Sequence, residues 1–79
     1  MKDQSKYDFE IKEHIGTIYT SPGGWTTELN VVSWDGKPAK YDLRAWDPDH
    51  KRCDRGLRMH KEDLLLLLRI LKERFGDGQ

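Results

Sequence analysis

Apolar and polar residues alternate with a period near two over the first two thirds of the chain. Residues 7–19 contain four apolar side chains among polar neighbours: Phe9, Ile11, Ile15 and Ile18. This pattern predicts one long bent strand or two short strands. Gly16 and the polar residues 12–14 indicate a bulge or break within this segment.

Three more strands are predicted after the first. Residues 25–34 (WTTELNVVSW) are rich in β-branched and aromatic residues, residues 39–46 alternate again, and residues 56–59 place Leu57 and Met59 on one side. A turn over residues 21–24 and an Asp35-Gly36 hairpin signal separate the first three strands. A polar loop over residues 47–55 precedes the last one. The expected order is strands first and one helix last.

The length of the loop at Asp35-Gly36 decides which residues share a face, because a slip of one residue turns a strand over. A two-residue loop would place Leu29 opposite Asp42 and mix apolar with charged side chains. A three-residue loop over residues 35–37 separates them, and we therefore prefer it. Its predicted pairs are Thr26 with Trp46, Glu28 with Arg44, Leu29 with Leu43, Asn30 with Asp42, Val31 with Tyr41 and Val32 with Lys40.

In this register four side chains are expected to point away from the core: Trp34, Lys40, Arg44 and Trp46. Exposed tryptophans beside cations are typical of surfaces that stack bases and hold phosphates. The structural alternative is that loops or a partner subunit cover both rings and that Glu28 pairs with Arg44. The residues alone leave both interpretations open.

Residues 61–75 (KEDLLLLLRILKERF) predict a helix with acidic residues in its first turn, basic residues in its last turn and Gly76 after it. An apolar stripe is expected to dock on the sheet: Leu64, Leu67, Leu68, Leu71 and Phe75. Leu66 and Ile70 lie opposite this stripe, with Leu65 between. An apolar back predicts a homodimer joined through this helix, unless the leucine run is simply tolerated at the surface.

Length and charge narrow the class of protein. We expect one domain over residues 7–75 between a flexible N-terminus (1–6) and a short tail (76–79). The single cysteine allows no internal disulfide, no run of about 18 apolar residues exists, and the first residues lack a secretory signal, so a cytoplasmic location is expected. The net charge is zero, but residues 37–60 carry seven basic and four acidic side chains, which localises any attraction for phosphate there.

Catalytic and metal motifs are weak in this sequence. His14, His50, His60 and Cys53 do not form a four-ligand zinc pattern, and no nucleophile has a base partner at a recognisable spacing. We therefore expect no metal, no cofactor and no enzyme activity.

The order of motifs resembles the positive cofactor four family of transcriptional coactivators, in its small bacterial YdbC-like branch. The resemblance covers about residues 7–74 and is carried by FEI (9–11), GGWTTELNVVSWDGKP (23–38), KYDLRAWDPD (40–49) and GLRMHKEDLLLLLRIL (56–71). It implies an α+β fold: a curved four-stranded antiparallel sheet followed by one C-terminal helix, dimeric through the helices, that binds single-stranded DNA.

The resemblance also implies roles for individual residues. Trp34 matches a base-stacking aromatic, Trp46 a second aromatic, and Lys37 and Arg44 match backbone-contacting basic residues. Val32 stands where eukaryotic members carry a basic residue, and their serine- and lysine-rich leading segment is missing, so their regulatory behaviour is not expected here.

Together these features predict a dimeric, largely sequence-independent binder of single-stranded DNA. Trp34 and Trp46 would stack bases, Lys37, Lys40 and Arg44 would neutralise phosphates, and Asn30 and Thr26 would donate hydrogen bonds between them. The alternative is a protein-interaction module that docks through the same aromatic face. The sequence distinguishes neither DNA from RNA nor transcription from replication or repair.

Overall fold

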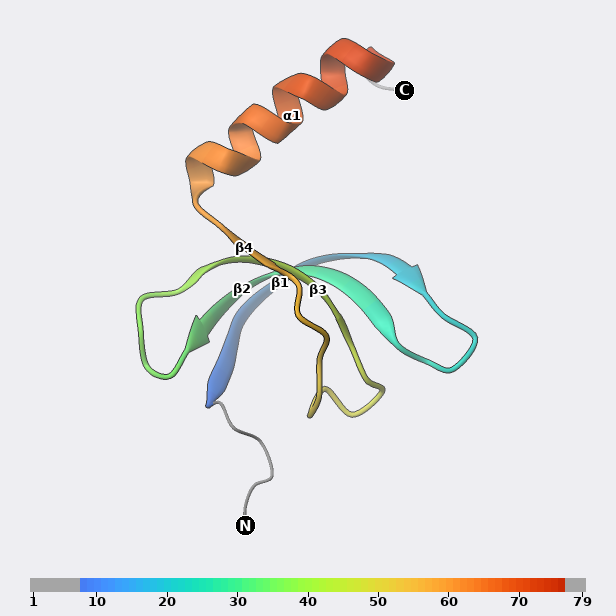
Figure 1. Ribbon diagram of the computed structural model, residues 1–79, viewed down its shortest axis with the longest axis vertical. Coiled ribbons are helices and arrows are strands. Elements are labelled where there is room, and N and C mark those ends of the chain that lie inside the picture. Colours follow the sequence, from blue (N-terminus) through green and yellow to red (C-terminus); the bar gives the residue numbers. More distant parts are fainter. Residues whose placement is uncertain (1–7, 77–79) are drawn as a thin grey trace.

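The computed structural model describes residues 8–76, so the expected flexible N-terminus (1–6) and most of the expected tail (76–79) lie outside the described residues. The chain forms an α+β fold of four strands followed by one helix (Figure 1). The elements are β1 (Phe9–Thr20), β2 (Thr26–Trp34), β3 (Lys40–Trp46), β4 (Leu57–Met59) and α1 (Lys61–Phe75). The strands form one antiparallel sheet in the order β1-β2-β3-β4.

The pairing of β2 with β3 has the register that the separation of apolar and charged residues predicts. Leu29 lies opposite Leu43, and Thr26 lies opposite Trp46. Asp35 and Gly36 both have positive φ, and the Lys37 N–H donates to the Trp34 carbonyl, as in the tight turns favoured by Asp-Gly. The turn therefore contains two residues, Asp35 and Gly36, and not the three expected over residues 35–37. One extra residue between Lys37 and Lys40 restores the predicted register, in which Val32 lies opposite Lys40.

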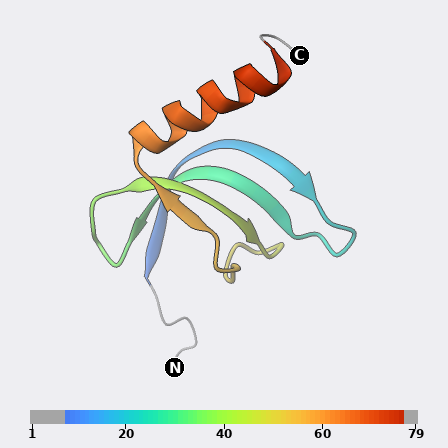
Figure 2. The ribbon, with the colours of Figure 1, turned by 45° about the horizontal axis from the view of Figure 1, so that its top comes forward.

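The sheet is strongly curved. β1 pairs with β2 through three register irregularities, between Ile11 and Glu13, His14 and Gly16, and Thr17 and Tyr19, which confirms the bulge expected in this strand. Bulges increase the local bend and twist of a strand. In Figures 1 and 2 the strands arch into a saddle, and α1 lies on its convex side.

The helix α1 begins and ends at the predicted residues. Asp63 accepts a hydrogen bond from the His60 N–H through Oδ2 (2.9 Å), so an acidic residue three positions into the helix compensates for an unusual N-cap residue. At the other end the Gly76 N–H donates to the Lys72 carbonyl (2.7 Å), with Gly76 at positive φ. No helix among residues 8–76 has the length and apolar character needed to cross a membrane.

The buried core lies on the concave face of the sheet, which corrects one expectation. Its fully covered apolar residues are Val32, Trp34 and Trp46, with Phe9, Ile11 and Cys53 packed against them. Trp34, Arg44 and Trp46 do point to the face that carries Asn30 and Asp42, but that face is not open to water. The prediction of outward, exposed rings is wrong because the sheet curls over them and residues 47–56 fold back beneath it.

The predicted docking of α1 on its own sheet is also wrong for the single chain. No residue of α1 is buried, and Leu67, Leu68, Leu71 and Phe75 are all exposed. The convex face beneath α1 carries half-buried Leu29, Val31, Tyr41 and Leu43. The radius of gyration, 14.2 Å, exceeds the roughly 11.6 Å expected for a compact chain of this length. The helix and the convex face are therefore two apolar surfaces that this chain leaves uncovered.

Candidate nucleic-acid interface

Three nearly parallel rings form a column on the concave face, which we call the ring column: Trp34, Trp46 and His50. Trp34 and Trp46 are inclined by 9° with centroids 6.1 Å apart, and Trp46 and His50 by 14° at 5.7 Å. Phe9 contacts both indoles in tilted geometry, at 5.6 and 5.0 Å. Such offset and tilted contacts are the favourable arrangements of aromatic rings.

The curl of the sheet creates this column. Trp34 ends β2 beside the turn, whereas Trp46 lies opposite Thr26 at the far end of the β2–β3 hairpin. Eight residues of extended strand would separate these two levels by about 26 Å on a flat sheet. The observed 6.1 Å between the ring centroids shows that the sheet is strongly curved and that both side chains lean inward from opposite ends of the hairpin.

Arg44 is bound within the concave face and is not available as a phosphate ligand in this conformation. Its Nε donates to Asp42 Oδ1 at 2.6 Å, its Nη1 donates to the Asp54 carbonyl at 3.3 Å, and its guanidinium lies 4.4 Å above the Trp34 ring. Burial lowers the pKa of Arg44, but the hydrogen bonds to Asp42 and Cys53 outweigh burial and leave the pKa above its ordinary value. Arg44 therefore stays charged and forms its ion pair with Asp42, and not with Glu28 as in the structural alternative, although Glu28 does lie opposite Arg44 in the predicted register.

Glu28 is the centre of a second buried polar group. It accepts hydrogen bonds from Thr26 and Asn30, and its Oε2 lies 2.7 Å from His50 Nε2. Burial would raise the pKa of Glu28, but these three hydrogen bonds and the nearby His50 hold it below its ordinary value. His14 extends the group by donating from Nδ1 to Asn30 Oδ1 at 2.7 Å.

The expected roles of Asn30 and Thr26 are corrected by this arrangement. Asn30 is completely buried, and its amide group donates to Glu28 while its oxygen accepts from His14. The Thr26 hydroxyl donates to Glu28. Both side chains direct their donors into the protein, so they support the concave face from within and do not present donors to a ligand.

Hydrogen bonds to Asp47 hold residues 50–52, which follow β3, in a tight turn. Its Oδ1 accepts hydrogen bonds from the backbone N–H groups of Lys51 (2.8 Å) and Arg52 (3.0 Å). The Arg52 N–H bond is the main reason that the pKa of Asp47 lies below its ordinary value. The His50 N–H donates to the Asp47 carbonyl (2.9 Å), and this turn holds the His50 ring against Trp46.

Gly56 lets the returning segment pass close to β3. A Cβ at this position would lie 2.3 Å from Arg44 Cβ and 2.7 Å from the Leu43 carbonyl oxygen, and its φ is +57°. Only glycine accepts both the close approach and the left-handed backbone without strain. The cover over Arg44 and the ring column therefore depends on this residue.

Three cations edge the concave face without a carboxylate partner among residues 8–76: Lys37, Lys40 and Arg58. Lys40 has the strand parity of Asp42 and Arg44, and Lys37 follows the turn beside Trp34. Arg58 lies opposite Asp42, with its guanidinium 5.1 Å above the Trp34 ring. All three are exposed. Lys37 and Lys40 therefore remain candidate phosphate-binding residues, and Arg58 is a third candidate.

Sequence reasoning missed the contact between His50 and Glu28 and the cation Arg58. The alternation of β4 carries a signal for Arg58, because Leu57 and Met59 point to the convex side and Arg58 must point to the other. His50 and Glu28 are 22 residues apart and meet only because residues 47–50 turn back toward β2. No local pattern indicates that contact.

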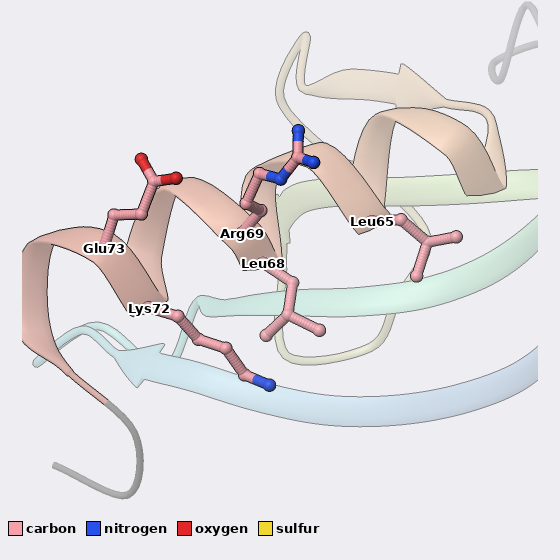
Figure 3. Close-up of a pocket in the computed structure, with 5 residues that line it drawn as sticks. All are labelled: Leu65, Leu68, Arg69, Lys72 and Glu73. Carbon is pink, nitrogen blue, oxygen red and sulfur yellow. The ribbon is translucent and has the colours of Figure 1, made fainter.

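The predicted interface residues Leu65, Leu66 and Ile70 are exposed on α1. Figure 3 shows one side of α1, where Leu65 and Leu68 lie beside Arg69, Lys72 and Glu73. This mixture of leucine with both signs of charge occurs on a helix with no buried residue. The predicted interface residues Leu65, Leu66 and Ile70 therefore lie on a surface that a partner could contact.

The fold and the concave face define a class: a small α+β protein with a curled antiparallel sheet, a ring column with two buried indoles, and cations at the edge of one face. Over 65 residues the chain is 37% identical to an uncharacterized protein of Treponema pallidum (strain Nichols), covering 82% of this chain and 76% of that protein. The chain belongs to the same family as this protein. No protein-family model matches the chain. Within residues 8–76 no three histidine, cysteine or acidic side chains are grouped to hold a metal ion.

Proposed function

We propose that the protein is a dimeric, largely sequence-independent single-stranded DNA-binding protein of the positive cofactor four type. The strand would run across the concave face of the sheet. The observation that carries the proposal is the combination, on one face, of the ring column with three exposed cations that have no carboxylate partner within residues 8–76: Lys37, Lys40 and Arg58. Proteins that bind single strands without sequence preference combine a basic groove with aromatic side chains.

The charges on this face favour an anionic ligand. Its buried carboxylates are each already compensated: Asp42 binds Arg44, and Glu28 accepts hydrogen bonds from Thr26, Asn30 and His50. The cations at the edge are not compensated by the described residues. The local excess of positive charge in residues 37–60 therefore lies where a phosphate backbone can reach it.

A second copy of the chain is the partner that best fits the uncovered apolar surface. α1 exposes Leu65, Leu66 and Ile70 on its back and Leu68 and Leu71 on its stripe, while the convex face exposes Leu57. Monomeric proteins rarely expose contiguous apolar patches of more than a few hundred Å². Isologous packing of α1 and the convex face would cover both surfaces and leave the two concave faces outside the interface.

The protein-docking alternative has less support. It required exposed aromatic rings on the polar face of the sheet, and Trp34 and Trp46 are buried. The same burial keeps both indoles from stacking on bases in this conformation, so the nucleic-acid proposal depends on the exposed cations and on His50, whose side chain is 38% exposed. The apolar surface that is exposed belongs to α1 and the convex side, where self-association accounts for it.

The test is a titration of fluorescently labelled oligothymidylate, followed by anisotropy, beside the same strand annealed to oligoadenylate and beside the matched RNA. We expect the single strand to bind more tightly than the duplex, whose bases are already stacked. Three phosphate contacts per copy predict a slope of log K against log salt near −2 per copy, at about 0.7 per contact. Absence of binding at low salt, or equal affinity for the duplex, would refute the proposal.

A further inference from the structure

We infer that His50 is the ring on which an unpaired nucleobase stacks, so that a base extends the ring column beyond Trp46. This inference rests on the proposed function and names a contact residue within it. Neither the motif order nor the predicted aromatic pair points to this histidine.

The three rings of the column differ in their exposure to solvent. Trp46 has no exposed surface and Trp34 only 5%, whereas 38% of the His50 side chain is exposed. At the other end, the guanidinium of Arg44 lies above Trp34. One face of the His50 ring is against Trp46, so His50 is the accessible end of the column. A flat ligand reaches His50 without moving the core, whereas contact with either indole requires the core to open.

The His50 ring is held in place before any ligand arrives. Its Nε2 lies 2.7 Å from Glu28, its N–H donates to Asp47, and its ring is nearly parallel to Trp46. Side chains that are already ordered lose little conformational entropy on binding. The ring is therefore a preorganised surface for stacking.

Two unfavourable features are concentrated at this end of the column. His50 has φ of +56°, which is uncommon for a residue with a side chain. The Trp46 Nε1–H is buried and has no acceptor among residues 8–76, at a cost of roughly 1–3 kcal/mol. Strained backbone and unsatisfied polar groups of this kind cluster at functional sites.

The ligand chemistry follows from the size and nature of the surface. A single imidazole face accommodates one heterocyclic base, and bases in a duplex do not present their faces. Lys51 follows His50, is exposed, and forms no ion pair within the described residues, so a cation for the adjoining phosphate is close in the chain. We expect stacking without strong preference among bases, because every base has a flat π face.

The experiment compares His50→Asn with His14→Asn in the full chain. Asparagine tolerates positive φ, so His50→Asn removes the ring without adding backbone strain. His14 is also a histidine near Glu28, at 3.4 Å, but stacks on no ring of the column, which makes His14→Asn a matched control. The probes are oligothymidylate and an abasic deoxyribose-phosphate strand of equal length.

We expect His50→Asn to weaken oligothymidylate binding about 5- to 150-fold, the fold-change of one lost base stack. The salt slope should not change, because no phosphate contact is removed. Binding of the abasic strand should equal that of wild type, His14→Asn should retain wild-type affinity for both probes, and His50→Phe should recover part of the loss.

Wild-type oligothymidylate affinity in His50→Asn would overturn the inference while leaving the proposed function intact. An equal loss on the abasic strand, or an equal loss in His14→Asn, would also overturn it, because either result assigns the effect to the Glu28 group. If wild-type protein binds neither probe, the proposed function itself fails.

Discussion

Replacing Ile70 with glutamine tests whether α1 is covered by a second copy. Ile70 lies on the back of α1, and 58% of its surface is exposed in the single chain. Full burial of an isoleucine is worth about 1.5–3 kcal/mol, so covering the exposed part is worth about 1–2 kcal/mol per copy. In an isologous interface the residue is buried twice. The variant should then lose about 2–4 kcal/mol per dimer, which raises the dimer dissociation constant about 30- to 700-fold.

Sedimentation equilibrium over a dilution series measures this change. Wild type should have twice the 9.3 kDa of one chain, and Ile70→Gln should dissociate at higher concentration. Lys61→Gln places the same residue on the exposed first turn of α1 and should behave as wild type. The reasoning is refuted if wild type remains a single chain at all concentrations, or if Ile70→Gln dissociates at the wild-type concentration.

Three further predictions concern the concave face. Gly56→Ala should lower the free energy of unfolding by about 2–5 kcal/mol, from the left-handed backbone and the clash with Arg44; an unchanged denaturant midpoint would contradict this. Because the pKa of Glu28 is lower in the folded protein than its ordinary 4.5, its carboxylate stabilises the fold fully above pH 4.5, and this contribution is lost as pH falls through the folded pKa. Glu28→Gln should therefore show a shallower loss of stability in acid than wild type, as measured by urea unfolding at several pH values, and parallel pH profiles would count against it. Lys40→Gln should reduce the salt slope of oligothymidylate binding by about 0.7 per copy and weaken all strand sequences alike; an unchanged slope would remove Lys40 from the interface.

The element order, the helix bounds and the β2–β3 register could be predicted from the sequence. Each depends on local information: alternation of side chains, the Asp35-Gly36 turn and the charges at the two ends of α1. The choice of register was decided by a physical requirement, that Leu29 and Val31 share a face with other apolar residues. Such requirements act between neighbouring strands and can be read from spacing.

The curvature of the sheet could not be predicted from that information. Whether Trp34 and Trp46 are exposed depends on how far the sheet curls and on how residues 47–56 return beneath it. Both are long-range properties, since Gly56 approaches Arg44 and His50 contacts Glu28 across 22 residues. The face of the sheet on which the rings lie could therefore be predicted from the sequence, but the burial of the two indoles could not.

The prediction that α1 packs on its own sheet was wrong for a different reason. The leucine stripe correctly indicates that α1 has apolar surface to cover, but periodicity does not identify which surface covers it. In the single chain the back of α1 is exposed, and so is the stripe apart from half-buried Leu64. A pattern of this kind specifies burial in the functional assembly, which we propose contains two copies.

The most direct test of the proposed binding face is an NMR titration of isotope-labelled protein with oligothymidylate. We predict that the signals that shift belong to the indole N–H groups of Trp34 and Trp46, to the backbone around His50 and to Lys40, with the α1 amides unchanged. Shifts concentrated in α1 and the convex strand positions, with the concave signals unmoved, would contradict the account.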